Sequence, residues 1–374
     1  MRRPVNPFRF GKEYVPECFI DREREYSEIL AGVQNGVNLV LIAPRRFGKT
    51  WLLQKFARES GFPTLYIDLF GILSVRDFAT QMAQEAYRLL REENPVAFVT
   101  RFLKDIAQYV SFSITAWGVS FSLHPTLPEE ECLQEALRLP HVLHETLKTQ
   151  VVVILDEFQE YERLSPKLPG LIRSAFQRKG GTSYIFSGSR RHLLERLFFT
   201  TSGPLYFSAK RVDMSNFLPR EATLSYLEER FRKSGKNIQE EALLYLFDLT
   251  RGHPYYVQFL SYEVWNLGGQ WITKDTVDAA CEMLLCHESY NYDVLIEALG
   301  YKHLKKVLSL LASKEKEIFN PQVLTRWGIS SPALLQKTLA KLIDYGIVEK
   351  LHPGKYELLD PLFAMYVERR FGSR

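Results

Sequence analysis

The chain has 374 residues, of which 46% are hydrophobic and 13% aromatic, and its net charge is +4. This length exceeds one ordinary hydrophobic core and predicts two or three domains, while the apolar content excludes an intrinsically disordered chain. The four cysteines form no C-x-x-C pair, which argues against a structural zinc site. The opening MRRPVNP lacks the apolar segment of a signal peptide, and no apolar stretch is long enough to cross a bilayer. We therefore expect a soluble, cytoplasmic protein with no membrane contact.

The first part of the chain alternates apolar strands with helices. A proline-containing entry leads into a helix near Phe19–Glu23, for which Asp21 is the expected N-cap. Residues 112–114 and 119–123 are expected to form a hairpin. Further strands are expected at 37–42, 63–69, 151–155, 183–187 and 205–207, with helices at 51–60, 75–91 and 129–146. This alternation predicts an α/β domain with a mostly parallel sheet.

From Pro219 onward the pattern is almost entirely helical. Helices expected at 221–234, 239–250, 254–267 and 273–286 would form a helical lid. Helices at 304–311, 321–327 and 332–345, followed by short strands at 347–351 and 356–359, describe a winged helix. The expected domains are therefore 1–215, 216–295 and 296–374.

The stretch from Ala43 to Thr50, A-P-R-R-F-G-K-T, follows an apolar strand and precedes a helix, which is the context of a phosphate-binding loop. Gly48 allows the backbone to approach a phosphate, Lys49 can reach the β- and γ-phosphates, and the Thr50 hydroxyl can bind Mg²⁺. Ala43 replaces the first glycine of the motif, and the loop can still close if φ there is negative. The motif predicts binding of a nucleoside triphosphate.

Two acidic residues, Asp156 and Glu157, directly follow the apolar run 151–155. An aspartate at the end of such a strand can hold Mg²⁺ opposite Thr50, and Glu157 can polarise a water for attack on the γ-phosphorus. A solvated strand end is the simpler alternative. Together with Lys49 and Thr50, however, the pair predicts hydrolysis of the nucleotide.

A serine at the end of the neighbouring strand can sense the γ-phosphate or hold the attacking water. Ser187 is the first candidate and Ser189 the second, although either could instead cap the helix expected from residue 192. Further along, Gly252-His253-Pro254-Tyr255-Tyr256 opens a lid helix, where a proline in the first turn is ordinary.

In this order the motifs resemble those of the archaeal-type prokaryotic ATPases, a group related to the AAA+ and STAND ATPases. The resemblance rests on five blocks in chain order: Phe19–Glu23, Pro44–Thr50, Leu155–Gln159, Phe186–Ser189 and Gly252–Tyr256. Asp21 stands where the first block has a glycine, and Leu359–Phe363 resembles the closing D-P-x-x block. The resemblance covers nearly the whole chain. It implies a P-loop NTPase (AAA+-like) core with a helical lid and a C-terminal winged helix, and it implies ATP and Mg²⁺ as cofactors.

The resemblance also implies how ATP is held. Adenine would lie near Phe19 and Ile20, and His253 with Pro254 would close over the nucleotide. The expected cofactor-binding residues are thus Phe19, Ile20, Pro44, Arg45, Arg46, Phe47, Gly48, Lys49, Thr50, Trp51, His253 and Pro254. Relatives often supply an arginine from a second subunit, which implies a homo-oligomer. The candidates for this arginine are Arg190, Arg191, Arg196 and Arg211.

The last 75 residues carry 13 Lys and Arg against 7 Asp and Glu, so the expected winged helix is basic. Its third helix offers Gln336, Lys337 and Lys341, and its wing offers Lys355, for contact with DNA. Winged helices also serve as protein–protein modules. We expect a Mg²⁺-dependent ATPase switch, slow or partner-stimulated, with Glu157, Lys49, Asp156 and Ser187 as its catalytic residues. The alternative is a DNA-binding regulator or an oligomeric scaffold in which ATP is largely structural.

Overall fold

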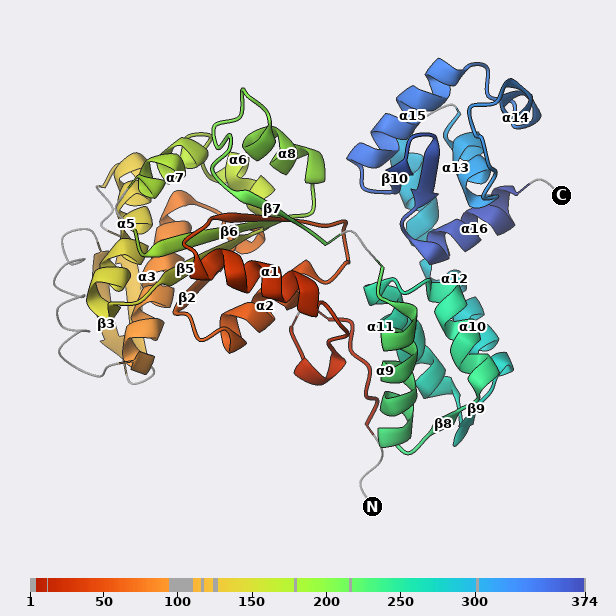
Figure 1. Cartoon of the computed structure of the whole chain (residues 1–374), viewed down its shortest axis with the longest axis horizontal. Helices are drawn as coiled ribbons and strands as arrows, with labels where there is room; N and C mark the ends of the chain where they lie inside the picture. The colour runs from red at the N-terminus through yellow and green to blue at the C-terminus, as the bar shows by residue number, and fades with distance from the viewer. Residues whose placement is uncertain are drawn as a thin grey trace. The chain divides into compact units, whose positions relative to one another are not determined.

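The computed structural model describes residues 5–11, 13–93, 110–115, 118–123, 127–177, 180–214, 217–300 and 303–372. The chain divides into two compact units (Figure 1). The sheet unit contains residues 22–43 and 49–214, and the helical unit contains residues 1–21, 44–48 and 215–374. None of the described helices has the length and apolar character needed to cross a membrane.

A five-stranded parallel sheet is the centre of the sheet unit. Its strand order is β2-β5-β6-β1-β7. In chain order the strands are β1 (Leu39–Ile42), β2 (Thr64–Asp68), β5 (Val151–Asp156), β6 (Thr182–Gly188) and β7 (Lys210–Asp213). The register pairs Asp68 with Asp156, and Ile42 with Gly188. The segments that follow these strands therefore emerge at one edge of the sheet.

The sheet is buried on both faces because apolar side chains occupy successive positions of its inner strands. Every residue of β1 and β5 is buried. Alternate residues, such as Val40, Val153 and Phe186, share one core with helices α3 (Val75–Glu93), α5 (Glu129–Leu147), α7 (Leu168–Phe176) and α8 (Arg191–Phe199). Helices α1 (Glu23–Gln34) and α2 (Lys49–Glu59) lie on the other side of the sheet (Figure 1). This is the layered arrangement that the alternation of strands and helices predicts.

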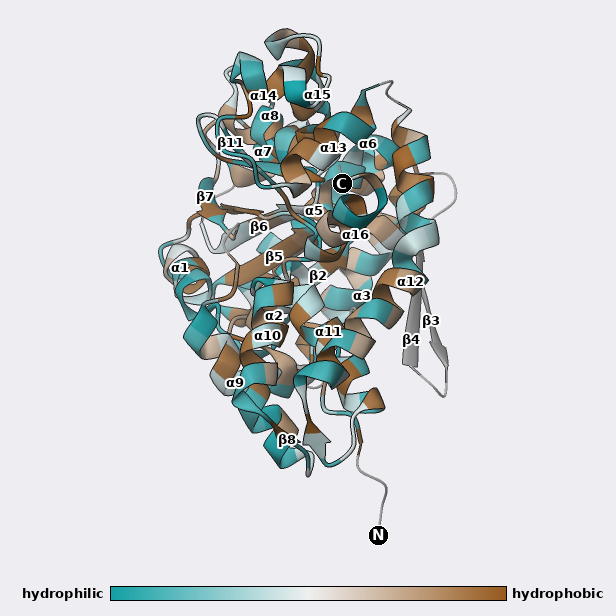
Figure 2. Cartoon of the chain, turned by 90° about the vertical axis from the view of Figure 1, so that its right-hand side faces the viewer, coloured by the Kyte–Doolittle hydropathy of each residue, from teal (hydrophilic) through white to brown (hydrophobic). Residues whose placement is uncertain are grey.

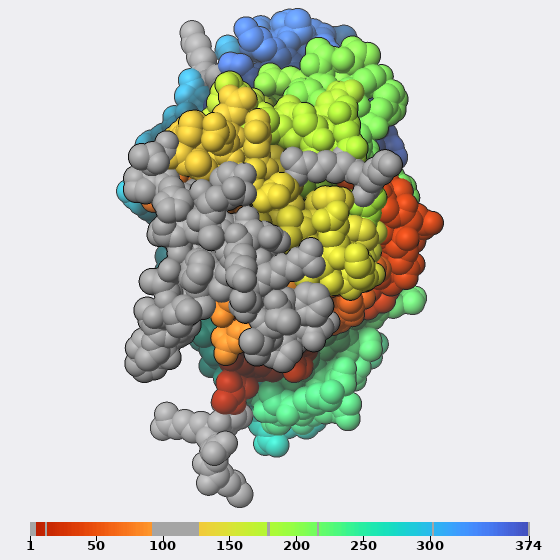
Figure 3. Space-filling view, turned by 90° about the vertical axis from the view of Figure 1, so that its left-hand side faces the viewer, coloured from red at the N-terminus to blue at the C-terminus, as the bar shows by residue number. Residues whose placement is uncertain are grey.

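Several short elements complete the sheet unit. The antiparallel hairpin of β3 (Val110–Thr115) and β4 (Gly118–Leu123) confirms the expected pairing of residues 112–114 with 119–123. The α5 helix lies at the surface (Figure 3), and its first turn exposes three consecutive glutamates. Short helical turns η2 (Leu69–Gly71) and η3 (Phe158–Glu160) follow β2 and β5, and η3 leads into α6 (Tyr161–Leu164).

The helical unit is built around one continuous apolar core. Its helices are α9 (Arg220–Lys233), α10 (Glu240–Thr250), α11 (Pro254–Leu267) and α12 (Lys274–Leu299), followed by α13 (Leu304–Ala312), α14 (Pro321–Arg326), α15 (Pro332–Asp344) and α16 (Pro361–Phe371). Phe8 of the N-terminal segment, Leu260 and Val367 belong to this core. Hydrophobic and hydrophilic residues alternate around α9 and α10 (Figure 2), as expected of helices packed on one side.

Three smaller features complete the helical unit. Strands β8 (Asn237–Ile238) and β9 (Trp271–Ile272) form a short parallel pair. Strands β10 (Val348–His352) and β11 (Lys355–Leu358) form an antiparallel hairpin after α15. A short turn, η1 (Pro16–Cys18), precedes α1 in the sequence. The expected division into domains 1–215, 216–295 and 296–374 stays a prediction, and residue 295 lies inside the continuous helix α12.

Two local predictions are wrong, each for a physical reason. Residues 205–207 form no strand, because the amides of Tyr206 and Ser208 bond locally to the carbonyl groups of Gly203 and Leu205. The edge strand is β7 instead, in register with β1. Asp21 does not cap α1, since the residue before this helix is Arg22, in a left-handed conformation with no side-chain cap.

Two helices extend beyond the sequence expectation. Helix α12 continues past residue 286 to Leu299, where Gly300 ends it with a φ of 59°. Its last turns bury Tyr292 and Ile296 in the apolar core, and this packing outweighs the polar sequence between them. For helix α16 the sequence indicates only the D-P-x-x block at its start. Asp360 of this block caps the helix by accepting a hydrogen bond from the Phe363 amide.

Candidate active site

The loop between β1 and α2 carries the phosphate-binding sequence. Arg46 and Gly48 have positive φ values of 66° and 86°, whereas Ala43 is not among the described residues with positive φ. An alanine in place of the motif's first glycine is therefore unstrained. Lys49 is the first residue of α2, and its buried ammonium group donates to the Ala43 carbonyl at 3.3 Å. The loop thus closes on itself, with its lysine at the amino end of a helix.

Asp156, at the end of β5, is almost fully buried, and its carboxylate accepts three hydrogen bonds. The Thr50 hydroxyl and the Tyr66 hydroxyl donate to Oδ2 at 2.9 and 2.8 Å, and the Glu157 amide donates to Oδ1 at 2.9 Å. Burial, and then the neighbouring carboxylate, raise the pKa of Tyr66, which keeps its hydroxyl a donor. Such charge-assisted hydrogen bonds offset the cost of burying a carboxylate.

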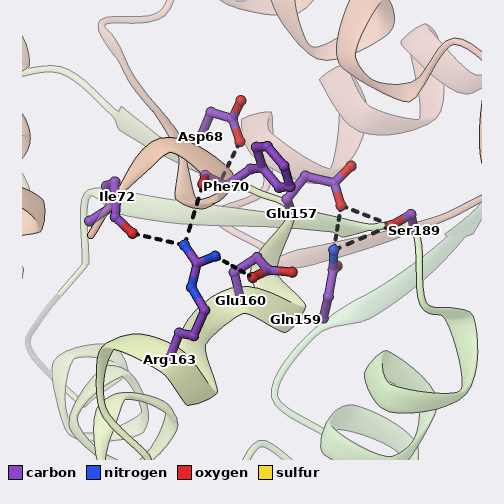
Figure 4. Close-up of polar contacts among 8 residues, drawn as sticks. All are labelled: Asp68, Phe70, Ile72, Glu157, Gln159, Glu160, Arg163 and Ser189. Carbon is purple, nitrogen blue, oxygen red and sulfur yellow. Dashed lines mark hydrogen bonds and ion pairs between the residues drawn. The ribbon is translucent and has the colours of Figure 1, made fainter. Parts of the chain in front are cut away.

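Glu157 follows directly, in a left-handed conformation with a φ of 50°. Its carboxylate accepts hydrogen bonds from the Ser189 hydroxyl at 2.9 Å and from the Gln159 amide, which also lies 3.3 Å from the Ser189 oxygen (Figure 4). Gly188 lies beside this cluster, and a Cβ there would lie 2.2 Å from the Gln159 side-chain oxygen Oε1, so the Gln159 side chain would have to shift. The carboxylate of Glu157 is therefore held by two neutral polar side chains.

The two serine candidates differ in environment. Ser189 bonds Glu157, and the residue that precedes α8 is Arg190, with no side-chain cap, so Ser189 does not cap this helix. Ser187 lies fully buried in β6, and its hydroxyl has no hydrogen-bond partner among the described residues. A catalytic role for Ser187 stays a prediction.

An exposed arginine ties together the turns that follow β2 and β5. Arg163 lies 3.5 Å from the Glu160 carboxylate and donates to the carbonyl groups of Phe70 and Ile72 at 3.4 and 3.1 Å (Figure 4). Asp68 accepts from the Phe70 amide at 3.0 Å. These bonds hold the backbone next to the Glu157 cluster, where Phe70 is 55% exposed.

The resemblance assigns one pair of residues to contact with adenine and another pair to the lid that closes over the nucleotide. Both pairs lie in the helical unit. Ile20 belongs to its apolar core, and Phe19 is half-buried against the ring of Tyr14. His253 is buried directly before α11, and its ring lies 4.8 Å from that of Phe47 in the loop. Pro254 opens α11, and Trp51 is half-buried in α2. None of these contacts tests a role in nucleotide binding.

Three of the four candidate arginines are paired with carboxylates. Arg191 and Arg211 share Glu195 at 3.0 and 2.9 Å, and Arg196 lies 3.9 Å from Glu162. Arg211 also pairs with Asp213 at 2.7 Å, and the hydrogen bond that Arg211 donates to Asp213 raises the pKa of Arg211. Arg190 is exposed and forms no ion pair within the described part of the chain.

The four cysteines differ in their exposure to solvent. Cys18, Cys132 and Cys281 are buried, and Cys286 is exposed. Over the described ranges, no three His, Cys, Asp or Glu side chains gather as a metal site. The oxygens of Thr50 and Asp156 thus remain the candidate metal ligands.

Sequence reasoning missed two polar residues of the site, Tyr66 and Gln159. Tyr66 carries a signal, because a tyrosine inside an otherwise apolar strand requires a partner for its hydroxyl. Gln159 ends the Leu155–Gln159 block of the resemblance, but its contact with Glu157 depends on how η3 turns back toward β6.

Comparison with known proteins identifies the fold. No protein-family model and no curated protein sequence matches the chain. The Walker-type ATPase PABY2304 of Pyrococcus abyssi is similar at a TM-score of 0.69 and 19% identity, covering 97% of this chain and 99% of that one. The ORC2 protein of Aeropyrum pernix, in its ADPNP and ADP complexes, is similar at a TM-score of 0.52 and 13% identity. The match covers 97% of this chain and 98% of that one. The chain has the P-loop NTPase, AAA+-like fold.

Proposed function

We propose that the protein is a Mg²⁺-dependent ATPase of AAA+/STAND type that acts as a molecular switch. The observation that carries the proposal is the hydrogen bond from Thr50 to Asp156 at 2.9 Å, directly after the Lys49 that opens α2. It brings the two halves of the nucleotide motif together at the carboxyl edge of a parallel sheet. Ligands of such folds bind at that edge.

The residues present fit a magnesium ion. A hydroxyl and a carboxylate are the hard oxygen donors that Mg²⁺ prefers, and water molecules and phosphates complete its shell. Thr50 and Asp156 would hold the ion, which neutralises charge on the β- and γ-phosphates. Tyr66 keeps Asp156 oriented through its own hydrogen bond.

Phosphate binding falls to the loop and its lysine. The amide groups of the loop and the first turn of α2 attract the phosphates, and Lys49 adds a full charge. Arg45 and Arg46 are exposed and add positive charge to the loop. This arrangement resembles that of other phosphate-binding loops, which supports ATP as a ligand.

Glu157 would polarise the attacking water. The hydrogen bonds that it accepts from Ser189 and Gln159 orient the carboxylate. Hydrolysis is slow when no arginine stabilises the developing charge. Arg190 is the best of the four candidates for such an arginine, because it is exposed and forms no ion pair within the described ranges. In a homo-oligomer, one subunit would supply Arg190 to the active site of its neighbour.

The first experiment compares the parent protein with Lys49→Ala. We expect Lys49→Ala to weaken Mg-ATP binding by about tenfold to a hundredfold, the value of a hydrogen bond to a charged group, and to abolish turnover. Binding is measured by titration calorimetry, and turnover by phosphate release. Lys55→Ala is the matched control, because Lys55 lies on the same helix and its ammonium group lies 2.7 Å from the Glu59 carboxylate.

The outcomes of this experiment separate the alternatives. ATP binding by Lys49→Ala equal to that of the parent would contradict the proposal. Specific activity that rises with protein concentration supports an arginine supplied between subunits. Tight ATP binding with negligible turnover at every concentration favours instead a regulator or oligomeric scaffold whose nucleotide is structural.

DNA binding is a second candidate function, favoured by the basic surface of the C-terminal segment. Helices α13, α14 and α15 and the hairpin β10–β11 follow the element order of a winged helix. Gln336, Lys337 and Lys355 are exposed, and Lys341 is half-buried. These side chains would contact phosphates and base edges.

The DNA proposal makes a salt-dependent prediction. The full-length protein is expected to bind duplex DNA at low salt and to lose affinity steeply as salt rises, because phosphate contacts release counterions. Lys337→Ala should weaken binding and reduce the salt slope by about one. A gel shift or fluorescence anisotropy measures both. No binding at low salt would rule this function out.

A further inference from the structure

Arg46, the second arginine of the phosphate loop, is bound by the lid. Its guanidinium lies 4.5 Å from the centre of the Tyr255 ring, and it donates to the Tyr256 hydroxyl at 3.3 Å. Both tyrosines are in the first turn of α11. Arg46 itself has a positive φ of 66°. All of these residues belong to the helical unit.

The hydrogen bonds continue from Tyr256 to the far end of the sequence. The Tyr256 hydroxyl donates to the Asp360 carboxylate, and the Tyr292 hydroxyl lies 3.4 Å from the same oxygen. A phenol has one proton, so Tyr256 accepts from Arg46 and donates to Asp360. Burial raises the pKa of Tyr256, which keeps that proton in place. The chain of hydrogen bonds therefore runs in one direction, from the guanidinium group of Arg46 to the carboxyl group of Asp360.

Asp360 has a structural role of its own. Its other oxygen accepts from the Phe363 amide at 2.9 Å and so caps helix α16. Leu362 and Phe363, in the first turn of this helix, are fully buried in the core that also contains Leu308 of α13. The position of Asp360 thus sets the position of the amino end of α16.

We propose that Tyr256 and Asp360 are positioning residues for Arg46 and that they transmit occupancy of the phosphate loop to helix α16. The proposal rests on the proposed function, since it takes a nucleotide phosphate as the ligand. A phosphate offers Arg46 a charged acceptor in place of a neutral hydroxyl, and charge-assisted hydrogen bonds are about twice as strong. Arg46 then leaves Tyr256, and Asp360 loses the cation at the start of its chain of hydrogen bonds.

Hydrogen–deuterium exchange of the full-length protein tests this coupling. The ligand is Mg²⁺ with a non-hydrolysable ATP analogue, and the readout is exchange of the amides from Leu362 to Tyr366. In the parent protein, we expect nucleotide to change their exchange rate by about fivefold or more, the usual size of a coupling between sites. In Tyr256→Phe, which lacks only the hydroxyl, this response should disappear while the analogue still binds.

The adjacent tyrosine provides a matched control. Tyr255→Phe keeps the ring under Arg46, so it should respond like the parent. Asp360→Asn keeps a helix cap but removes the charge, and it should lose the response as Tyr256→Phe does. If Tyr256→Phe does not fold, the comparison of Asp360→Asn with Tyr255→Phe tests the proposal. A response of Asp360→Asn as large as that of Tyr255→Phe would overturn it.

The experiment distinguishes failure of this inference from failure of the proposed function. A parent that binds the analogue without any response in α16, or a Tyr256→Phe response as large as that of the parent, overturns this inference alone. A parent that binds no nucleotide overturns the proposed function and this inference with it.

Discussion

Replacement of Glu157 by glutamine is expected to lower ATP turnover by about 10²- to 10⁴-fold, the range for loss of a general base. An amide cannot accept the proton of the attacking water. It still accepts a hydrogen bond from Ser189, so the local geometry is retained. ATP binding should stay within about threefold of the parent, because this side chain acts on the water rather than on the phosphates. Single-turnover phosphate release and equilibrium binding of labelled ATP measure the two effects.

Glu160→Gln is the matched control for this change. Glu160 is three residues away and faces Arg163, at 3.5 Å, instead of Ser189. Its replacement should leave turnover within about twofold of the parent, as expected when only a partly exposed ion pair is lost. Equal losses in the two variants would mean that acidic charge in general supports the reaction. Unchanged turnover in Glu157→Gln would remove Glu157 from the mechanism.

Replacement of Phe186 by alanine should destabilise the protein by about 3–5 kcal/mol, the usual cost of deleting a buried phenylalanine. Phe186 is fully buried in β6, and its ring lies 4.8 Å from those of Phe158 and Phe198. Phe158 follows Glu157 directly, so the cavity would open beneath the candidate catalytic residue. Denaturation by urea, followed by circular dichroism, measures the loss.

The control for Phe186→Ala is Phe207→Ala. Phe207 is 79% exposed, so this substitution should change stability by less than about 0.5 kcal/mol. Phe186→Leu should recover most of the lost stability, since it refills most of the cavity. A Phe186→Ala protein as stable as the parent would show that the aromatic cluster is not the main support of this part of the sheet.

The central elements of the fold could be predicted because their sequences are locally unambiguous. The run from Val151 to Leu155 has too many β-branched residues for any element except a buried strand, and it became β5. The phosphate loop is equally explicit, because glycine, lysine and threonine must stand in that order. For Thr50 and Asp156, the expected proximity follows from a general property of parallel sheets.

The remaining features depend on contacts that no local pattern encodes. Residues 205–207 have the composition of a strand, but Leu205 is buried in a turn and β7 takes the edge of the sheet. Gln159 reaches Glu157 only because η3 turns back toward β6. The Arg46 to Asp360 chain of hydrogen bonds joins residues more than three hundred positions apart, which periodicity cannot reveal.

The helical unit is discontinuous in sequence, and this has a consequence for biosynthesis. Asn6 donates to the Tyr262 carbonyl group at 2.9 Å, across 256 positions, and Phe8 packs against Phe231. Asn6 and Phe8 are therefore translated well before the helices that they contact. The sheet unit, residues 22–43 and 49–214, lies between them in the sequence and can fold while the helical unit still lacks most of its residues. The helical unit can complete its core only after the sheet unit has been translated.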